Sequence, residues 1–250
     1  MSLITYICRK RHYYMRKTLL TAAILVLVLP TIAQKRKSIP SDKPQLIIGI
    51  VIEDMRYDYI HRFWDNFGDG GFRKLIGEGT LCRNASYNYM LTQTSPGLAT
   101  IATGCEPLVH GIVSDEWYVQ LQEQNIGSVS DAKEHAIGIQ SDKSNYSPRN
   151  ILTTTFSDEL KLFSNGKSKV ISISLNPTSA ILPGGHMCDA AYWFDDNSGL
   201  WITSSYYCDS LPSWVNEFNN KKFPDTYIEK DWLPSLPTDK YRDGSVKGKS

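Results

Sequence analysis

The sequence predicts an α/β protein in which helices flank a mostly parallel central sheet. Residues 45–52 (QLIIGIVI) and 169–175 (KVISISL) are apolar and β-branched runs, typical of strands that are buried on both faces in a parallel sheet. Segments with helical character lie between these runs, and an alternation of strands and helices indicates a layered α/β domain. Aromatic and β-branched flanks around residues 195–199 (DDNSG) add a β-hairpin.

The other elements follow in chain order. Apolar residues between positions 55 and 78 are interrupted by a Gly-Asp-Gly-Gly turn, which predicts two short helices. Residues 87–91 form a candidate strand, and residues 96–103 form a helix with Pro96 in its first turn. A helix is expected over residues 150–163. The polar segment after residue 216 contains no convincing final strand or helix pair.

The composition is that of an ordinary globular protein, with 41% hydrophobic and 21% charged residues. The formal net charge is +1, but the first 33 residues hold five basic and no acidic side chains, so the remainder carries −4. A mildly acidic body gives no support for a nucleic-acid-binding surface.

The N-terminal residues have the pattern of a secretory signal. Basic residues precede the apolar run 19–29, small residues follow it, and Met15 is a possible true start. We expect residues 1–33 to be a signal peptide, residues 34–44 a linker and residues 45–250 the folded portion. The expected location is periplasmic or secreted, with no stable membrane span after cleavage; a retained membrane anchor is the alternative.

Four cysteines lie beyond the predicted signal: Cys82, Cys105, Cys188 and Cys208. Cys188 and Cys208 are equidistant from Ser198, so a hairpin that closes there would bring them close to disulfide range and leave Cys82 with Cys105. The alternative is four reduced thiols, because connectivity cannot be deduced from sequence.

Two polar residues mark a candidate site. Asp54 follows the first predicted strand, at the carboxyl edge where ligands bind in open α/β sheets, and Thr94 lies at the start of the helix over residues 96–103. A helix N-terminus favours anions, and a carboxylate can hold a divalent metal that activates a hydroxyl. The alternatives are that Asp54 and Thr94 only cap helices.

Six segments resemble the alkaline phosphatase superfamily, in its phosphodiesterase/nucleotide pyrophosphatase branch, and are similar to bacterial periplasmic phosphatases that use threonine. They occur in family order between Leu46 and Tyr241: VIEDMRYDYIHRFW, GDGGFRKLIGEGTLCRNASYNY, TSPGLATIATGCEPLVHGI, SPRNILTTTFSDELKL, SKVISISLNPTSAILPGGH and AYWFDDNSGLWITSSYY. The resemblance implies an alkaline phosphatase-like sandwich with a hairpin insertion and without its C-terminal part.

The resemblance also implies a phosphate ester as substrate and a site with two Zn²⁺ ions. Asp54 would be a metal ligand, and Thr94 would bind metal and become phosphorylated before water releases phosphate. His110, in the same motif, is interpreted as structural.

Three departures from the family pattern bear on activity. Asp115 stands where the family has an asparagine that contacts a phosphoryl oxygen, so Asp115 is predicted to face the substrate. Where monoesterase relatives carry a lysine and an arginine two residues apart, the sequence is interpreted as having Arg149, which can bind phosphate, and Ile151, which cannot. The remaining family ligands are missing, and Asp131 with His135 is only a weak candidate metal pair.

We therefore expect the N-terminal half of an exported, zinc-dependent phosphomonoesterase or phosphodiesterase, truncated and inactive alone. The alternative is a non-catalytic exported α/β binding protein that has lost the metal site.

Overall fold

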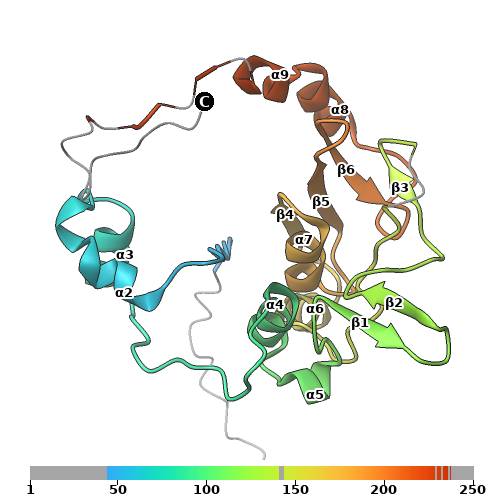
Figure 1. Ribbon diagram of the computed structural model, residues 1–250, viewed down its shortest axis with the longest axis horizontal. Coiled ribbons are helices and arrows are strands. Elements are labelled where there is room, and N and C mark those ends of the chain that lie inside the picture. The colour runs from blue at the N-terminus through green and yellow to red at the C-terminus, as the bar shows by residue number, and fades with distance from the viewer. Residues whose placement is uncertain (1–43, 141–143, 229, 232, 236, 238–250) are drawn as a thin grey trace, which may run out of the picture. The chain divides into compact units, whose positions relative to one another are not determined.

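The computed structural model describes residues 44–140, 144–228, 230–231, 233–235 and 237 (Figure 1). The chain divides into two compact units, residues 1–55 and 56–250. The predicted signal peptide and nearly all of the predicted linker lie outside the described residues. No helix among the described residues is long and apolar enough to cross a membrane.

Residues 45–52, in the first unit, do not form the strand that their composition predicts. Their aliphatic side chains are exposed, with Leu46 at 74% and Ile50 at 79%. A β-strand is stabilised by a ladder of hydrogen bonds to a neighbouring strand, and the described part of this unit, residues 44–55, contains no second strand. Apolar composition therefore did not suffice for strand formation.

The second unit begins with the two predicted helices. These are α2 (Tyr57–Arg62) and α3 (Phe72–Glu78), with the 3-10 helix η1 (Trp64–Asn66) between them. Gly71 precedes α3 with a φ of 56°, a backbone conformation that glycine adopts without strain.

Residues 87–91 do not form the predicted strand, and residues 88–90 are bends. Two tyrosines in this segment contact the helix that follows through their hydroxyl groups. Tyr87 Oη donates to Gly97 O at 3.4 Å, and Tyr89 Oη donates to Pro96 O at 3.2 Å. The alternation of aromatic residues thus reflects packing along a helix, not pairing in a sheet.

The helix predicted from Pro96 is α4 (Thr94–Thr103), which begins two residues earlier and ends at Gly104 in the left-handed conformation. The next elements are the short helix α5 (Pro107–His110), the antiparallel pair β1 (Glu116–Val119) and β2 (Gln124–Gly127), and the short strand β3 (Ala136–Ile137).

The helix expected over residues 150–163 is shorter: α6 (Phe156–Phe163) begins only after Thr155. Thr155 and Asp158 form a capping box, in which each side chain accepts a hydrogen bond from the backbone N–H of the other residue. This local hydrogen bonding fixes the helix start at a position that apolar periodicity did not identify.

The main sheet has four strands in the order β3-β6-β5-β4. The pair β4–β5 is parallel, whereas β5–β6 and β3–β6 are antiparallel. The fold class is α/β as predicted, and the described sheet combines a parallel pair with the predicted hairpin. Its strands are β4 (Ile171–Ser174), β5 (Ala190–Asp195) and β6 (Leu200–Ser204), joined to β3.

The hairpin register does not place Cys188 directly opposite Cys208, as the disulfide hypothesis requires. Trp193 lies opposite Ile202 and Asp195 opposite Leu200, so the hairpin is centred between Asn197 and Ser198. The disulfide hypothesis requires a hairpin centred on Ser198. Because the observed centre lies half a residue earlier, each residue faces a partner one position away from the one that the hypothesis requires. All four cysteines in the described residues, Cys82, Cys105, Cys188 and Cys208, are free thiols.

Helix α7 (Pro177–Gly184) packs against β4 and β5, and α4 packs against α7 (Figure 1). Side chains from these three layers form one buried core. Ile151, which is only 3% exposed, belongs to this core and is a packing residue. The core contains Leu98, Ala99, Ile112, Val129, Ile151, Ala180, Ile181, Leu182, Ala191, Trp193 and Ile202.

The opposite face of the sheet is covered only in part. Ile171 and Ile173 of β4 are 60% and 57% exposed, so this strand is not buried on both faces as its composition predicts. Contrary to expectation, the C-terminal segment does form helices, α8 (Ser213–Asn220) and α9 (Phe223–Ile228).

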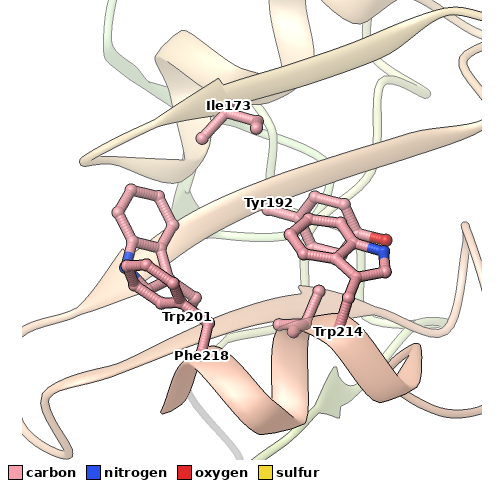
Figure 2. A pocket seen from close by; sticks show the side chains of 6 residues that line it. Ile173, Tyr192, Trp201, Trp214 and Phe218 are labelled. Carbon is pink, nitrogen blue, oxygen red and sulfur yellow. The ribbon is translucent and has the colours of Figure 1, made fainter. Parts of the chain in front are cut away.

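An apolar pocket of about 180 Å³ lies between this face of the sheet and α8 (Figure 2). The only ionisable side chain in its lining is the phenol of Tyr192, whose pKa is raised by burial. The pocket therefore lacks the groups that phosphoryl transfer requires. Its lining consists of Ile173, Tyr192, Trp201, Trp214, Val215 and Phe218.

Candidate active site at the start of helix α4

Thr94 is the first residue of α4 and is half-buried. The N-cap position is held by Gln93, with extended backbone and no side-chain hydrogen bond to the helix. The suggestion that Thr94 is itself a simple N-cap is therefore wrong. Its hydroxyl belongs to the first turn, where backbone N–H groups lack partners within the helix and the positive end of the helix dipole lies.

Asp115 lies at this helix start. Its Oδ1 accepts a hydrogen bond from the backbone N–H of Ser95 at 2.8 Å. Ser95 directly follows Thr94, so the structure brings these two predicted site residues together. A carboxylate at a helix N-terminus is stabilised both by the hydrogen bond and by the dipole.

Polar residues that the sequence analysis did not identify hold Asp115 in place. Gln93 Oε1 accepts from the backbone N–H of Asp115 at 3.0 Å and from Ser114 Oγ at 2.7 Å. The backbone N–H of Ser128 donates to the Asp115 carbonyl at 2.8 Å, and Ser95 Oγ lies 2.9 Å from Ser128 Oγ. The sequence contained little indication of these contacts, because they join residues that are up to 33 positions apart in the chain.

His110 is structural, as interpreted from the sequence. It is completely buried, its Nδ1 accepts from the Ile112 backbone N–H at 3.1 Å, and its Nε2 lies 3.1 Å from Thr100 Oγ1. This arrangement makes Nε2 the donor to Thr100, whose hydroxyl also lies 2.8 Å from Tyr89 Oη. These hydrogen bonds connect α4, through Thr100, to Tyr89 before the helix and to His110 and Ile112 after it. Burial lowers the pKa of His110.

The lowered pKa predicts that His110 destabilises the fold in acid. The unfolded chain binds a proton near pH 6.5, whereas the folded imidazole remains neutral, so this contribution to stability is full above about pH 6.5 and is lost as the pH falls. Urea unfolding of the wild type and of His110→Gln between pH 8 and pH 5 should show a smaller loss of stability in acid for the variant. Equal losses would contradict the prediction.

Arg149 forms ion pairs rather than presenting an unpaired cation. Its Nε lies 2.8 Å from Asp131 Oδ2, and its Nη2 lies 3.5 Å from Glu134 Oε1. The buried Asp131 carboxylate also accepts from Ser147 Oγ and from the Lys133 backbone N–H. Two carboxylates thus engage the guanidinium, and the role of Arg149 in substrate binding stays a prediction.

The weak metal pair Asp131 and His135 does not lie on a helix. Asp131 is engaged by Arg149, and no group of three or more His, Cys, Asp or Glu side chains that could hold a metal exists within the described residues. The described part of the chain thus does not by itself provide a complete site for zinc.

Asp54, the predicted metal ligand, lies in a turn of the first unit and is exposed. Its φ of 56° is in the left-handed region, which aspartate tolerates better than most residues. Thr94 belongs to the second unit, so the proximity of Asp54 and Thr94 stays a prediction.

Another polar cluster that the sequence analysis missed lies beside α6. Buried Asp158 accepts from the backbone N–H groups of Thr155 and Met187, and its Oδ2 lies 3.4 Å from His186 Nδ1. His186 Nε2 donates to the Ile151 carbonyl at 3.1 Å. The available signal was the Thr-x-x-Asp spacing of the capping box. These hydrogen bonds join the start of α6 to Ile151 and to residues 186–187.

The structure combines an α/β sheet with a helix that begins at a threonine, and the N-terminus of a helix is a position that favours an anion. The chain belongs to the type I phosphodiesterase/nucleotide pyrophosphatase family, whose sequence model matches residues 47–249. This family lies in the alkaline phosphatase superfamily, in agreement with the resemblance noted in the sequence.

The relatives include several alkaline phosphatases. The alkaline phosphatase PhoV of Synechococcus elongatus is 40% identical over 207 residues, which cover 83% of this chain and 38% of PhoV. The alkaline phosphatase PafA of Elizabethkingia meningoseptica is 38% identical over 214 residues, which cover 85% of this chain and 39% of PafA. The chain thus spans less than two fifths of the length of these relatives.

Solved structures of PafA share the fold. The wild-type crystal structure has a TM-score of 0.76 at 38% identity and matches 79% of this chain and 38% of PafA. A PafA variant, in which a threonine is replaced by serine and an asparagine, a lysine and an arginine by alanine, has a TM-score of 0.74 and matches 76% of this chain and 37% of PafA.

Proposed function

We propose that the protein hydrolyses phosphate esters with Thr94 as the nucleophile. The observation that carries this proposal is the position of Thr94 at the start of α4, in a chain of the phosphodiesterase family. In this position the helix dipole and the first-turn N–H groups favour negative charge on a phosphoryl group. Attack by the threonine Oγ on phosphorus would break the ester P–O bond and release the protonated alcohol, leaving the phosphoryl group on Thr94. Water would then release that group, as phosphate from a monoester or as a phosphomonoester from a diester.

The spacing of residues in PafA supports Thr94 and Asp115. In the PafA variant the substituted threonine and asparagine are 21 positions apart, which is also the separation of Thr94 and Asp115. The equal separation supports the assignment of Thr94 and Asp115 to the positions of the substituted threonine and asparagine of PafA.

The same comparison does not support Arg149 as a phosphate ligand. The substituted lysine and arginine of PafA lie 83 and 85 positions after its threonine, whereas Arg149 lies 55 positions after Thr94. The corresponding stretch of this chain, residues 174–182, contains neither lysine nor arginine.

Zinc is proposed as the cofactor, with the Asp54 carboxylate as one of its ligands and Thr94 as another. Zinc ions would lower the pKa of the threonine hydroxyl and stabilise charge on the phosphoryl oxygens. Since the described residues do not complete such a site, we assign no further ligands. Periplasmic or secreted location is likewise a proposal that rests on the signal-like residues 1–33.

Zinc dependence can be tested on the protein expressed from its complete gene. EDTA is expected to abolish hydrolysis of phenyl phosphate and methyl phenyl phosphate, and added Zn²⁺ should restore it. Asp54→Ala should lower the bound zinc measured by elemental analysis, because one carboxylate ligand is removed. Asp58→Ala, which removes an exposed carboxylate four residues later, is the control and should retain zinc.

Full activity in EDTA would contradict the metal-dependent mechanism. Bound phosphate with no hydrolysis, in the presence of zinc, would favour the alternative of a non-catalytic binding protein.

A further inference from the structure

We propose that Asp115 makes the Thr94 site selective for phosphate esters with a single negative charge, which means phosphodiesters rather than phosphomonoesters. This inference rests on the function proposed above and concerns the substrate class of the same site. It depends on where the Asp115 carboxylate lies, on what holds it there and on the charges around it.

The carboxylate occupies part of the anion-binding end of α4. Asp115 Oδ1 accepts the Ser95 backbone N–H at 2.8 Å, and Ser95 is bonded directly to Thr94. A phosphoryl group positioned for attack by Thr94 Oγ would therefore lie within a few ångströms of a negative charge. An asparagine at this position would offer an amide N–H₂ donor to the phosphoryl oxygens instead.

The surrounding hydrogen bonds oppose a movement of Asp115 away from the site. Gln93 Oε1 accepts its backbone N–H at 3.0 Å, and its carbonyl accepts from the Ser128 backbone N–H at 2.8 Å. Ser128 is also linked to Ser95 by a contact of 2.9 Å between their hydroxyl oxygens. These contacts fix the backbone of Asp115 on both sides of its Cα, so repulsion from a substrate is not relieved by a simple loop movement.

No cation among the described residues neutralises this carboxylate. None of the ion pairs formed within residues 44–140 and 144–228 includes Asp115. Arg149 is paired with Asp131 and Glu134, and residues 174–182 carry no basic side chain.

The resulting repulsion depends on the charge of the substrate. A phosphomonoester carries about two negative charges above its second pKa near 6, whereas a diester carries one. Since the interaction energy is proportional to each charge, the carboxylate disfavours the monoester twice as strongly. At a separation of about 5 Å and an effective dielectric constant between that of a protein surface and that of water, one additional charge corresponds to a difference of about 10- to 100-fold in binding.

The test compares phenyl phosphate with methyl phenyl phosphate, which differ by one methyl group and one charge. It uses the zinc-loaded protein from the complete gene at pH 8. Asp115→Asn is expected to raise kcat/KM for the monoester by about 10- to 100-fold relative to the diester. The effect should shrink below about pH 6, where the monoester loses its second charge. Glu116→Gln, which removes the exposed carboxylate of the next residue, should leave the ratio unchanged.

The outcomes distinguish this inference from the proposed function. Hydrolysis that depends on Thr94, with a substrate ratio unchanged in Asp115→Asn, would overturn the selectivity and leave the nucleophile intact. If no variant hydrolyses either ester, the proposed function fails, and binding of inorganic phosphate measured by calorimetry decides the role of Asp115. Tighter binding in Asp115→Asn would support the inference, whereas equal or undetectable binding in both proteins would overturn it.

Discussion

Thr94→Ala is expected to reduce phosphate ester hydrolysis by at least about 10³-fold, because it removes the proposed nucleophile but leaves the helix that binds the phosphoryl group. Thr94→Ser should retain part of the activity, since it keeps a hydroxyl at the first position of α4. The measurement is kcat/KM for phenyl phosphate and methyl phenyl phosphate with the zinc-loaded protein. Acid quenching followed by peptide mass spectrometry should detect phosphate on Thr94 in the wild type and not in Thr94→Ala.

Thr103→Val is a matched control for this prediction. Thr103 belongs to the same helix, but it lies at the other end, where its hydroxyl donates to the Ala99 carbonyl at 2.7 Å. The variant should keep the wild-type rate apart from any small loss of stability. Hydrolysis that survives in Thr94→Ala at the rate of the Thr103→Val control would rule out Thr94 as nucleophile.

Asp158→Ala is expected to lower the free energy of unfolding by about 3–5 kcal/mol, the range for removing one partner of a buried ion pair. The carboxylate is 1% exposed and accepts from two backbone N–H groups and the Thr155 hydroxyl in addition to its contact with His186. Its loss leaves these donors without partners and removes the capping box of α6. Urea unfolding followed by circular dichroism measures the change.

Glu159→Ala is the control for Asp158→Ala. Glu159 is the next residue and also acidic, but it is exposed, so its replacement should change stability by no more than about 0.5 kcal/mol. Similar losses in both variants would show that the Asp158 network is not a major source of stability.

The contribution of the Asp158–His186 pair should vary with pH. Burial by itself would raise the pKa of Asp158, but hydrogen bonds from His186, Thr155 and Met187 together lower it. Its contribution to stability is therefore present above the unfolded value near 4 and is lost in stronger acid. Asp158 raises the pKa of His186, whose contribution is full below about pH 6.5 and is lost as the pH rises through the folded value. The stability difference between wild type and Asp158→Asn should therefore be largest between about pH 4 and pH 6.5, as unfolding curves across pH 3–8 can check.

The family motifs indicated Thr94 and Asp115 as site residues, and the structure places the Asp115 carboxylate at the backbone N–H of the residue after Thr94. By contrast, the aromatic alternation of residues 87–91 indicated a strand, although Tyr87 and Tyr89 bond to α4. Alternating and helix-facing aromatic residues give the same pattern in a short segment, so sequence could not separate them.

The sequence by itself determined the α/β class, the family and the helix that begins at the nucleophile candidate, because these depend on composition, order and local spacing. Tertiary structure decided the pairing of the hairpin, the ion pairs of Arg149 and the buried network of Asp158. It also placed Ile151 in the core. These features depend on contacts between residues that are distant along the chain. A register shift of one residue turns each side chain of a strand to the other face of the sheet, and local sequence does not specify the register.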